Sequence, residues 1–467
     1  MKTRTEKDSI GEFQVPADAY WGVQTARAVE NFPISGLCFH PDFFWAMAHI
    51  KYAAAQANRA LGKLDKKRTE AILKAAEEVI EGKFNDQFVV DVYQAGAGTS
   101  THMNMNEVVA NRANEVLGSP KGSYKELNPN DHVNLGQSTN DVIPTTIRVG
   151  ALRLVKKLLS ELQALAAAFN KKACEFYPIV KSGRTHLQDA TPVRLGQEFG
   201  AYAECLKGWG QRIDQASKDL EWLGIGGSAT GTGLNTHPQY REKLVAVLAQ
   251  RTGFSLKLSP NLFEAMQSMA PLIHVSNAVR GTALDLIRIC NDLRLLSSGP
   301  RTGFAEIILP PVQPGSSIMP GKVNPVLPEM MSMVCFQVLG HDSTIAYASQ
   351  AGQLELNVMM PVIGYNLLQM LEIFRTACTA LRARCVEGIQ ADKERCRWYA
   401  EQTLGLATAL NPFIGYLKAA EVAKESHQSG RTVREVILEK KVLTEKELEE
   451  RLSPENLTEP HDITQKA

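Results

Sequence analysis

The sequence predicts an all-α protein, with an elongated central bundle of long helices flanked by two small, mainly helical domains. Two observations predict this class. Between about residues 145 and 400, long stretches carry apolar residues at alternating spacings of three and four, which keeps a stripe on one helix face. Before and after them, shorter amphipathic patterns alternate with polar loops. We therefore expect an N-terminal domain over 1–140, the bundle over 141–395 and a C-terminal domain over 396–467.

Three stretches carry the stripe most clearly, from Leu152 to Phe169, from Leu195 to Leu223 and from Val275 to Leu296. Each predicts a helix of roughly 30 residues, about 45 Å long at 1.5 Å per residue. A fourth region, about 326–390, is equally rich in apolar residues but less regular. Helices of this length must bury their stripes against one another, which predicts the bundle.

The flanking segments predict shorter elements. "HIKYAAAQANRALGKL" and "TEAILKAAEEVIEGKF" are amphipathic, whereas "GSYKELNPNDHVN" is typical of a loop. "REVILEKKVLTEKELEERL" predicts two short helices broken at "VLT", where Thr444 caps the second helix and Glu447 lies three residues further on. The polar tail "SPENLTEPHDITQKA" is expected to be frayed.

Composition excludes several classes of protein. The 467 residues are 44% hydrophobic and 22% charged, which is typical of a soluble globular protein. The net charge of +1 favours neither nucleic acid nor an anionic membrane, and there is no apolar run of membrane-spanning length. The N-terminus lacks the apolar core of a secretory signal. The eight scattered cysteines form no CxxC pair and predict reduced, buried thiols in a cytoplasmic protein.

One helical segment is apolar on more than one face. "GTALDLIRICNDLRLL" leaves apolar residues beyond the stripe that faces its own bundle. A second apolar face predicts contact with another copy of the chain, and hence a homo-oligomer. A helix at the centre of a monomeric bundle would show the same pattern.

Four segments interrupt the helical pattern with small polar residues: "GAGTSTHMNMNE", "NLGQSTNDVIPT", "SGRTHLQDATP" and "QPGSSIMPGKVNPVLPE". Taken singly, such residues cap helices and form turns, a lone histidine is structural, and a lone lysine is a solvated surface charge. Together they supply many hydrogen-bond donors and few carboxylates, which suits an anionic ligand. The candidate binding residues are Thr99, Ser138, Thr139, Asn140, His186, Ser316, Ser317, Lys322 and Asn324.

The same four segments also limit the class of ligand that the site can bind. They contain neither GxxxxGK[ST] nor GxGxxG after a strand, so no nucleotide-phosphate loop is expected. No cysteine–histidine cluster has metal-ligand spacing, so neither a metal nor an organic cofactor is expected. Gly315 and Gly321 allow a loop backbone to approach a ligand closely. A small dicarboxylate fits, with one carboxylate at Lys322 and Asn324 and the other among hydroxyl and backbone N–H groups.

The segment "GSSIMPGKVNP" (315–325) resembles the signature of the fumarase/aspartase superfamily, and the likeness extends from "VPADAYWGVQTARAVENF" to "LSPENLT". This resemblance implies a homotetramer whose subunits pool their bundles and build each active site from three chains. It also implies reversible anti elimination that releases fumarate through an aci-carboxylate intermediate.

The resemblance assigns a role to each candidate residue. Ser316 matches the general base. Four positions match the donors to the carboxylate on which negative charge develops: Thr99, Ser138, Thr139 and Ser317. Lys322 and Asn324 match the residues at the other carboxylate, Asn140 and His186 match those facing the leaving group, and Glu329 matches a carboxylate that orients the histidine.

Within the superfamily, four details resemble aspartate ammonia-lyases: "GAGTS", "QSTND", "YWGVQTARAVENF" and "DQFVVDVYQAGAGTS". Asn128 stands where fumarases have a histidine. Two other segments, "NMNMNEVVANRA" and "GGSATGTGLNTHP", resemble class II fumarases. His102 departs from both groups, which usually show asparagine there. We therefore expect an ammonia-lyase acting on L-aspartate, with class II fumarase and a non-catalytic structural homologue as alternatives.

Overall fold

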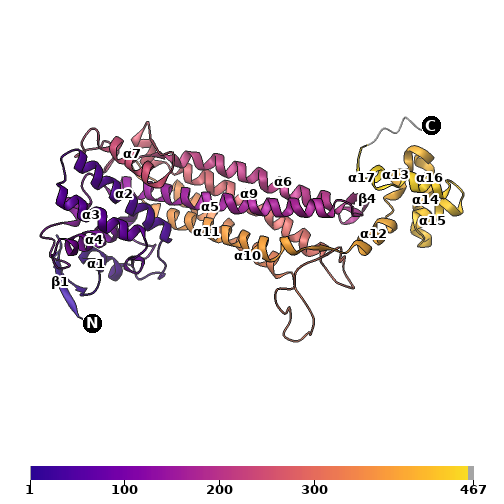
Figure 1. Ribbon diagram of the computed structural model, residues 1–467, viewed down its shortest axis with the longest axis horizontal. Coiled ribbons are helices and arrows are strands. Elements are labelled where there is room, and N and C mark those ends of the chain that lie inside the picture. Colours follow the sequence, from indigo (N-terminus) through magenta and orange to yellow (C-terminus); the bar gives the residue numbers. More distant parts are fainter. Residues whose placement is uncertain (1, 461–467) are drawn as a thin grey trace. The chain divides into compact units, whose positions relative to one another are not determined.

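A computed structural model describes residues 2–460, which form two compact units drawn from interleaved parts of the chain (Figure 1). Unit 1 takes the chain up to Ser160 together with Trp209–Ala283 and Val334–Thr376. Unit 2 takes Glu161–Gly208, Leu284–Met333 and the chain from Ala377 onward. Both are mostly helical, which confirms the predicted class. The division into three consecutive domains stays a prediction.

The predicted long stretches all form helices. They are α5 (Thr139–Phe176), α6 (Leu195–Ser217), α9 (Ala270–Leu296), α10 (Val326–Gln350) and α11 (Met360–Arg384). The fourth, less regular region is thus two helices. Between them, the side-chain amide of Asn357 donates to the carbonyls of Ala348 and Ser349 at the end of α10.

The prediction that the second stretch stays helical to Leu223 was wrong. After Ser217 the chain forms a 3-10 turn (η4, Lys218–Glu221) and a short strand, β5 (Trp222–Leu223), which pairs with β6 (Lys257–Leu258). The buried guanidinium of Arg148 donates to the carbonyls of Asp219 and Trp222, at 3.1 and 2.8 Å. These bonds satisfy carbonyls that the helix no longer uses.

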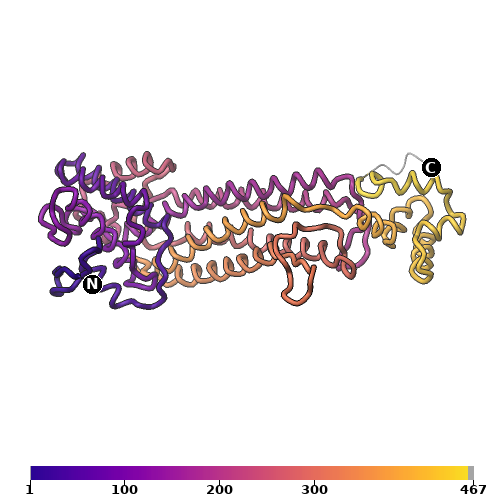
Figure 2. The backbone as a smooth tube through the Cα atoms, turned by 60° about the horizontal axis from the view of Figure 1, so that its bottom comes forward, coloured from indigo at the N-terminus to yellow at the C-terminus, as the bar shows by residue number. Residues whose placement is uncertain are grey.

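Segments of the long helices pack side by side within each unit (Figures 1 and 2). In unit 1, Ser276 of α9 donates to Asp342 of α10, and His341 of α10 contacts Asn366 of α11 at 2.6 Å. A Cβ added at Gly281 of α9 would overlap the indole ring of Trp209 of α6, so glycine permits this close approach.

In unit 2, the ring of Phe169 (α5) lies 6.0 Å from that of Phe199 (α6), and the Tyr202 hydroxyl lies 3.1 Å from Asp292 of α9. Side chains with no exposed surface, such as Phe169 and Phe199, form the interior of these helix pairs. The alternating stripe is therefore the buried face, as predicted.

Unit 1 also contains a hairpin of β1 (Thr3–Lys7) and β2 (Glu12–Pro16) and six shorter helices. They are α1 (Val23–Asn31), α2 (Pro41–Ala60), α3 (Lys66–Ile80), α4 (Thr99–Val116), α7 (Tyr240–Thr252) and α8 (Leu262–Gln267). Single-turn helices occur at Asn85–Gln87 (η1), Gly96–Gly98 (η2) and Pro129–Val133 (η3), the last within the segment predicted as a loop.

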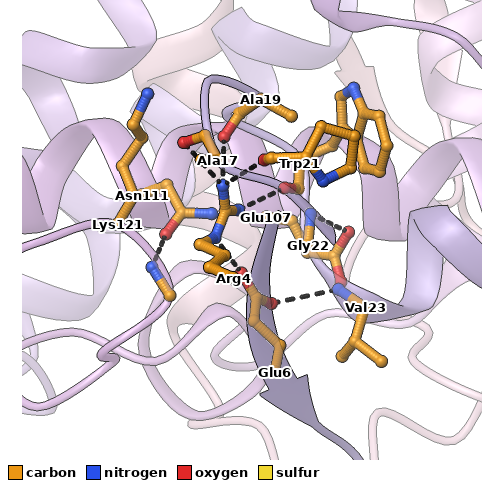
Figure 3. Close-up of polar contacts among 12 residues, drawn as sticks. Arg4, Glu6, Ala17, Ala19, Trp21, Gly22, Val23, Glu107, Asn111 and Lys121 are labelled. Atoms are coloured by element: carbon orange, nitrogen blue, oxygen red, sulfur yellow. Dashed lines mark hydrogen bonds and ion pairs between the residues drawn. The ribbon is translucent and has the colours of Figure 1, made fainter. Parts of the chain in front are cut away.

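A buried polar network fixes the motif "ADAYWGVQT" in unit 1 (Figure 3). Arg4 donates to the carbonyls of Ala19 and Trp21, at 2.8 and 2.7 Å. Glu107 of α4 accepts from the backbone N–H groups of Gly22, Gln24 and Thr25 at the start of α1. This motif, which the sequence analysis used for the family resemblance, is thus part of the structural framework.

In unit 2, β3 (Val180–Thr185) and β4 (Gln188–Arg194) form an antiparallel hairpin, and β7 (Ile307–Ile308) pairs with β8 (Gln390–Ala391). A 3-10 turn lies at Val386–Gly388 (η5). The C-terminal helices are α12 (Lys393–Gln402), α13 (Leu406–Ile414), α14 (Tyr416–Ser429), α15 (Val433–Glu439), α16 (Glu445–Arg451) and α17 (Pro454–Thr458).

The predicted cap of α16 is confirmed, because Thr444 and Glu447 form a reciprocal capping box. The prediction of a frayed tail was wrong for Pro454–Thr458. This segment forms a helix capped by Ser453, and the Arg194 guanidinium donates to Thr458 at 2.9 Å. The last residues of the predicted tail, 461–467, lie outside the described residues.

The cysteines follow the prediction only in part. Within residues 2–460, none of the eight forms a disulfide; five are buried, but Cys38 and Cys174 are exposed and Cys205 is partly so. Among residues 2–460, no helix is long and apolar enough to cross a membrane.

The second apolar face predicted in "GTALDLIRICNDLRLL" exists in the single chain. Leu284 is 52% exposed and Leu295 is 38% exposed, whereas Ile289 and Leu293 of the same helix are buried. Large apolar side chains of this kind mark protein interfaces when they cluster. The homotetramer itself stays a prediction.

Candidate active site

The first polar segment lies at the N-terminus of α4. Thr99 is the first residue of this helix, is exposed, and follows Gly98, whose φ of 89° is left-handed. The preceding turn is held by a hydrogen bond from the Ala97 N–H to the Val358 carbonyl, at 2.8 Å. The helix start therefore presents the Thr99 hydroxyl beside the backbone N–H groups of the first turn, an arrangement suited to an anion, although the Thr101 N–H already donates to Gln94 Oε1 at 2.8 Å.

The second polar segment lies at the N-terminus of α5, where Ser138, Thr139 and Asn140 are half-buried. The Asn140 side-chain N–H donates to the Ala229 carbonyl at 2.8 Å, which fixes the orientation of its amide. Its carbonyl oxygen, Oδ1, is then the atom that can accept a hydrogen bond from a ligand.

A buried carboxylate fixes this helix start to a distant glycine-rich loop. Asp141 accepts backbone hydrogen bonds from Ser138 at 2.9 Å and from Gly226 and Ser228 at 3.0 Å. Burial raises the pKa of Asp141 to about 6, against the lowering effect of these donors and of the Lys51 charge. Asp141 is therefore a positioning residue for the 138–140 segment, which the sequence analysis missed.

A histidine joins the two helix starts. His102 of α4 is buried, and its Nδ1 lies 2.9 Å from the Thr139 hydroxyl. Its Nε2 lies 2.7 Å from the Nζ of Lys51 on α2, whose side chain is also buried. The structure thus brings together the segments that contain Thr99 and Thr139. His102 stood out in the sequence as a departure from both groups of relatives, whereas Lys51 did not stand out.

The third polar segment is the hairpin of β3 and β4, which the sequence analysis did not predict. His186 and Leu187 form its two-residue turn, are exposed, and have φ values of 55° and 59°. Such positive φ values favour glycine or asparagine and cost energy for other residues. A strained turn of this kind is typical of a functional position.

Buried charges hold the stem of this hairpin. Glu306, which has no exposed surface, contacts Arg184 Nη1 at 2.9 Å and Lys181 Nζ at 2.9 Å. Lys181 also contacts Glu198 at 2.8 Å. The Arg184 guanidinium lies over the rings of Phe304 and Tyr399, at 4.2 and 4.9 Å. The stem is therefore fixed from both sides while the turn stays exposed.

The fourth polar segment is the loop before α10. Ser316 is half-buried, and its Oγ accepts hydrogen bonds from the backbone N–H groups of Ile318 and Met319, at 3.2 and 3.0 Å. Two donors on one hydroxyl oxygen stabilise the negative charge that this oxygen would carry as an alkoxide. Ser317 and Lys322 are exposed.

The neck of this loop is closed by its own backbone. The Gly315 N–H donates to the Lys322 carbonyl at 2.8 Å, and the Asn324 side-chain amide donates to the Gly315 carbonyl at 2.6 Å. A Cβ at Gly315 would lie 2.6 Å from the Lys322 carbonyl oxygen. The close approach at Gly315 is thus to the loop itself. Glu329 lies in the first turn of α10, and its orienting role stays a prediction.

The predicted site residues divide between the two units. Thr99, Ser138, Thr139 and Asn140 belong to unit 1, whereas His186 and the residues of the 315–329 segment belong to unit 2. Among residues 2–460, no group of three or more histidine, cysteine, aspartate or glutamate side chains is arranged to hold a metal ion.

The chain matches two family models, one described as lyase over residues 11–340 and one described as fumarase C C-terminus over residues 406–459. It is 48% identical to an aspartate ammonia-lyase of a Bacillus species over 457 residues, which are 98% of each chain. It is 50% identical to a class II fumarate hydratase of Halobacterium salinarum over 456 residues, 97% of each chain.

A solved structure is similar over the same length. The crystal structure of a fumarate lyase:delta crystallin from Brucella melitensis bound to cobalt has a TM-score of 0.95 and 47% identity. The match covers 98% of this chain and 100% of that one.

Proposed function

The chain belongs to the fumarase/aspartase family of lyases, which acts on dicarboxylates, and from this premise we propose that it is an aspartate ammonia-lyase. It would convert L-aspartate reversibly to fumarate and ammonia by anti elimination. The structural observation that supports this function is the fixed amide of Asn140, whose Oδ1 can accept a hydrogen bond from the ammonium of aspartate. The malate hydroxyl is also a donor, so the choice of aspartate over malate rests on the four sequence segments that resemble aspartate ammonia-lyases.

The barrier to this reaction is the loss of a weakly acidic Cβ proton beside a carboxylate. The resulting aci-carboxylate carries extra negative charge, and donors aimed at that charge in advance lower the barrier; losing one costs about 10²–10³ in rate. Four hydroxyls are proposed to donate to it: Thr99, Ser138, Thr139 and Ser317. Lys322 and Asn324 are proposed to hold the second carboxylate, and no metal or organic cofactor is part of this proposal.

Ser316 is proposed as the base that takes the Cβ proton. A serine hydroxyl is a weak base unless its alkoxide is stabilised. The two backbone N–H groups on Ser316 Oγ support such a role, and the charge of Lys322 in the same loop acts in the same direction. Asn140 and His186 are then proposed to face the leaving amine.

The alternative is a class II fumarase, which eliminates water from L-malate. Two sequence segments and the 50% identity to a class II fumarate hydratase favour it. At position 139 this chain has threonine where class II fumarases have serine, a difference of one methyl group. A methyl group changes the selectivity between substrates by only about 1–3 kcal/mol, so this position alone does not decide between the two enzymes.

A two-substrate assay tests the proposal. The purified protein is incubated separately with L-aspartate and L-malate, and fumarate is followed by its ultraviolet absorbance. Turnover of L-aspartate with little turnover of L-malate is expected. Turnover of malate alone would replace the proposal with the fumarase alternative, and turnover of neither would favour a structural homologue.

A further inference from the structure

Three buried or half-buried side chains form a continuous hydrogen-bonded series in unit 1. Lys51 Nζ lies 2.7 Å from His102 Nε2, and His102 Nδ1 lies 2.9 Å from the Thr139 hydroxyl oxygen. Lys51 has no exposed surface and His102 is 1% exposed. The series therefore runs from a buried amine to a residue proposed to bind substrate.

The partners of Lys51 determine the direction of these bonds. Besides His102, its Nζ lies 2.8 Å from Gln137 Oε1 and 3.3 Å from Asn134 Oδ1. An ammonium has three donors and no acceptor, so three acceptors match it fully. While Lys51 is an ammonium, the state that these three acceptors and the nearby Asp141 carboxylate favour, His102 Nε2 must accept, which places the imidazole proton on Nδ1.

The position of that proton determines the role of Thr139. A protonated Nδ1 donates to the Thr139 oxygen, so the Thr139 hydroxyl hydrogen must point to another acceptor. Burial and the charge of Lys51 both lower the pKa of His102, which keeps the imidazole neutral. Burial also lowers the pKa of Lys51, and the nearby Asp141 charge opposes that effect.

We propose that His102, oriented by Lys51, is a positioning residue that commits the Thr139 hydroxyl to donate its hydrogen to a carboxylate of the substrate. The inference rests on the proposed function of this site and adds the residues that determine its hydrogen-bond direction. With the opposite tautomer, the Thr139 hydroxyl would donate to His102 and offer the carboxylate only lone pairs.

Two substitutions at His102 separate the two ends of the imidazole. Asparagine places an amide near the position of Nδ1, so His102→Asn keeps a donor for Thr139 and loses the contact with Lys51. Glutamine places its terminal group near the position of Nε2, so His102→Gln keeps the contact with Lys51 and loses the hydrogen bond to the Thr139 hydroxyl. His49→Gln is the matched control, because His49 is also a buried histidine, on α2, and its Nδ1 has no hydrogen-bond partner.

The readouts are kcat/KM for the active substrate and the Kd of succinate, a four-carbon dicarboxylate without a leaving group. His102→Gln should lower kcat/KM about 10²-fold to 10³-fold, because it removes a donor to the developing charge. It should raise the Kd of succinate about tenfold, the effect of one hydrogen bond to a charged group. His102→Asn and His49→Gln should stay within about threefold. Equal losses in the two His102 variants would overturn the proposal.

A double-mutant cycle tests whether His102 acts through Thr139. Thr139→Val removes the hydroxyl and keeps the shape of the side chain. In that background His102→Gln should cause no further loss of succinate affinity. An undiminished tenfold loss would show that His102 acts by another route and would overturn the proposal.

The tautomer itself can be measured without any active variant. The protein is labelled with ¹⁵N-histidine, and the His102 signals are identified by their absence from the His102→Asn spectrum. The proposal requires hydrogen on Nδ1, and hydrogen on Nε2 would refute it. If the wild type turns over neither L-aspartate nor L-malate, the proposed function fails, while the tautomer and the succinate comparison still decide the inference.

Discussion

Glu306→Gln should disrupt the hairpin that presents His186. Glu306 has no exposed surface and is the buried carboxylate shared by Lys181 and Arg184. Glutamine has almost the same shape, so the change removes the charge and leaves the packing in place. It also turns one end of the side chain into a donor that faces two cations.

The magnitude follows from the contacts. Removing one partner of a buried ion pair leaves a buried charge without compensation and costs about 3–5 kcal/mol of unfolding free energy. Glu198→Gln is the matched control, because Glu198 contacts the same lysine but is 28% exposed. Burial raises the pKa of Glu198, so its charge is less well stabilised than that of a fully paired carboxylate. We expect a loss of about 1 kcal/mol there.

Urea unfolding followed by circular dichroism, at one protein concentration for all variants, measures these losses. Turnover, measured under conditions where every variant stays folded, reports how far displacement of the hairpin affects kcat. Glu306→Gln should lower kcat about 10-fold to 100-fold, because a small misplacement of His186, which is proposed to face the leaving group, has such an effect. Equal destabilisation by Glu306→Gln and Glu198→Gln, or a loss below about 1 kcal/mol in both, would refute the reasoning.

Three further predictions concern the site. Ser316→Ala should abolish turnover yet leave the Kd of succinate within about threefold, whereas near-normal turnover would exclude Ser316 as the base. Mixing inactive Ser316→Ala subunits with inactive Thr99→Ala subunits should restore part of the activity if copies of the chain share sites; no recovery in well-mixed oligomers would count against sharing. Because burial raises the folded-state pKa of Asp141 from its ordinary value of 3.8 to about 6, its contribution to stability is complete below pH 3.8 and is lost as the pH rises through 6. Between pH 4 and pH 6 the unfolding free energy of the wild type should therefore fall by about 2 kcal/mol relative to that of Asp141→Asn, and a difference that does not change with pH would contradict this assignment.

The features that the sequence predicted well are those that depend on local pattern. The apolar stripes identify the long helices because a buried helix face must repeat every three or four residues. The cap at Thr444 and Glu447 was predictable because its partners lie within one turn. The exposed Leu284 was likewise predictable, since it breaks the pattern that the bundle alone requires.

The features that the sequence did not predict depend on distant partners. Lys51 lies in an alanine-rich helical segment, and its acceptors Asn134 and Gln137 follow more than 80 residues later. Asp141 resembles a local helix cap, yet two of its three donors come from the loop at Gly226 and Ser228. The turn at His186 was missed because a two-residue hairpin loop normally contains glycine or asparagine.

The supports of the two kinds of site residue differ in a way that matches their proposed tasks. Groups that stabilise a developing charge must be fixed before the charge appears, and Thr139 meets this need at a helix start held by His102 and Asp141. The proposed base, Ser316, must let substrate enter and leave, and it lies on a loop whose tip carries the 82% exposed Ile318. Substitutions at the helix-start supports should therefore lower kcat more than they raise KM. Substitutions that open the loop neck, such as Asn324→Ala, should change kcat and KM together.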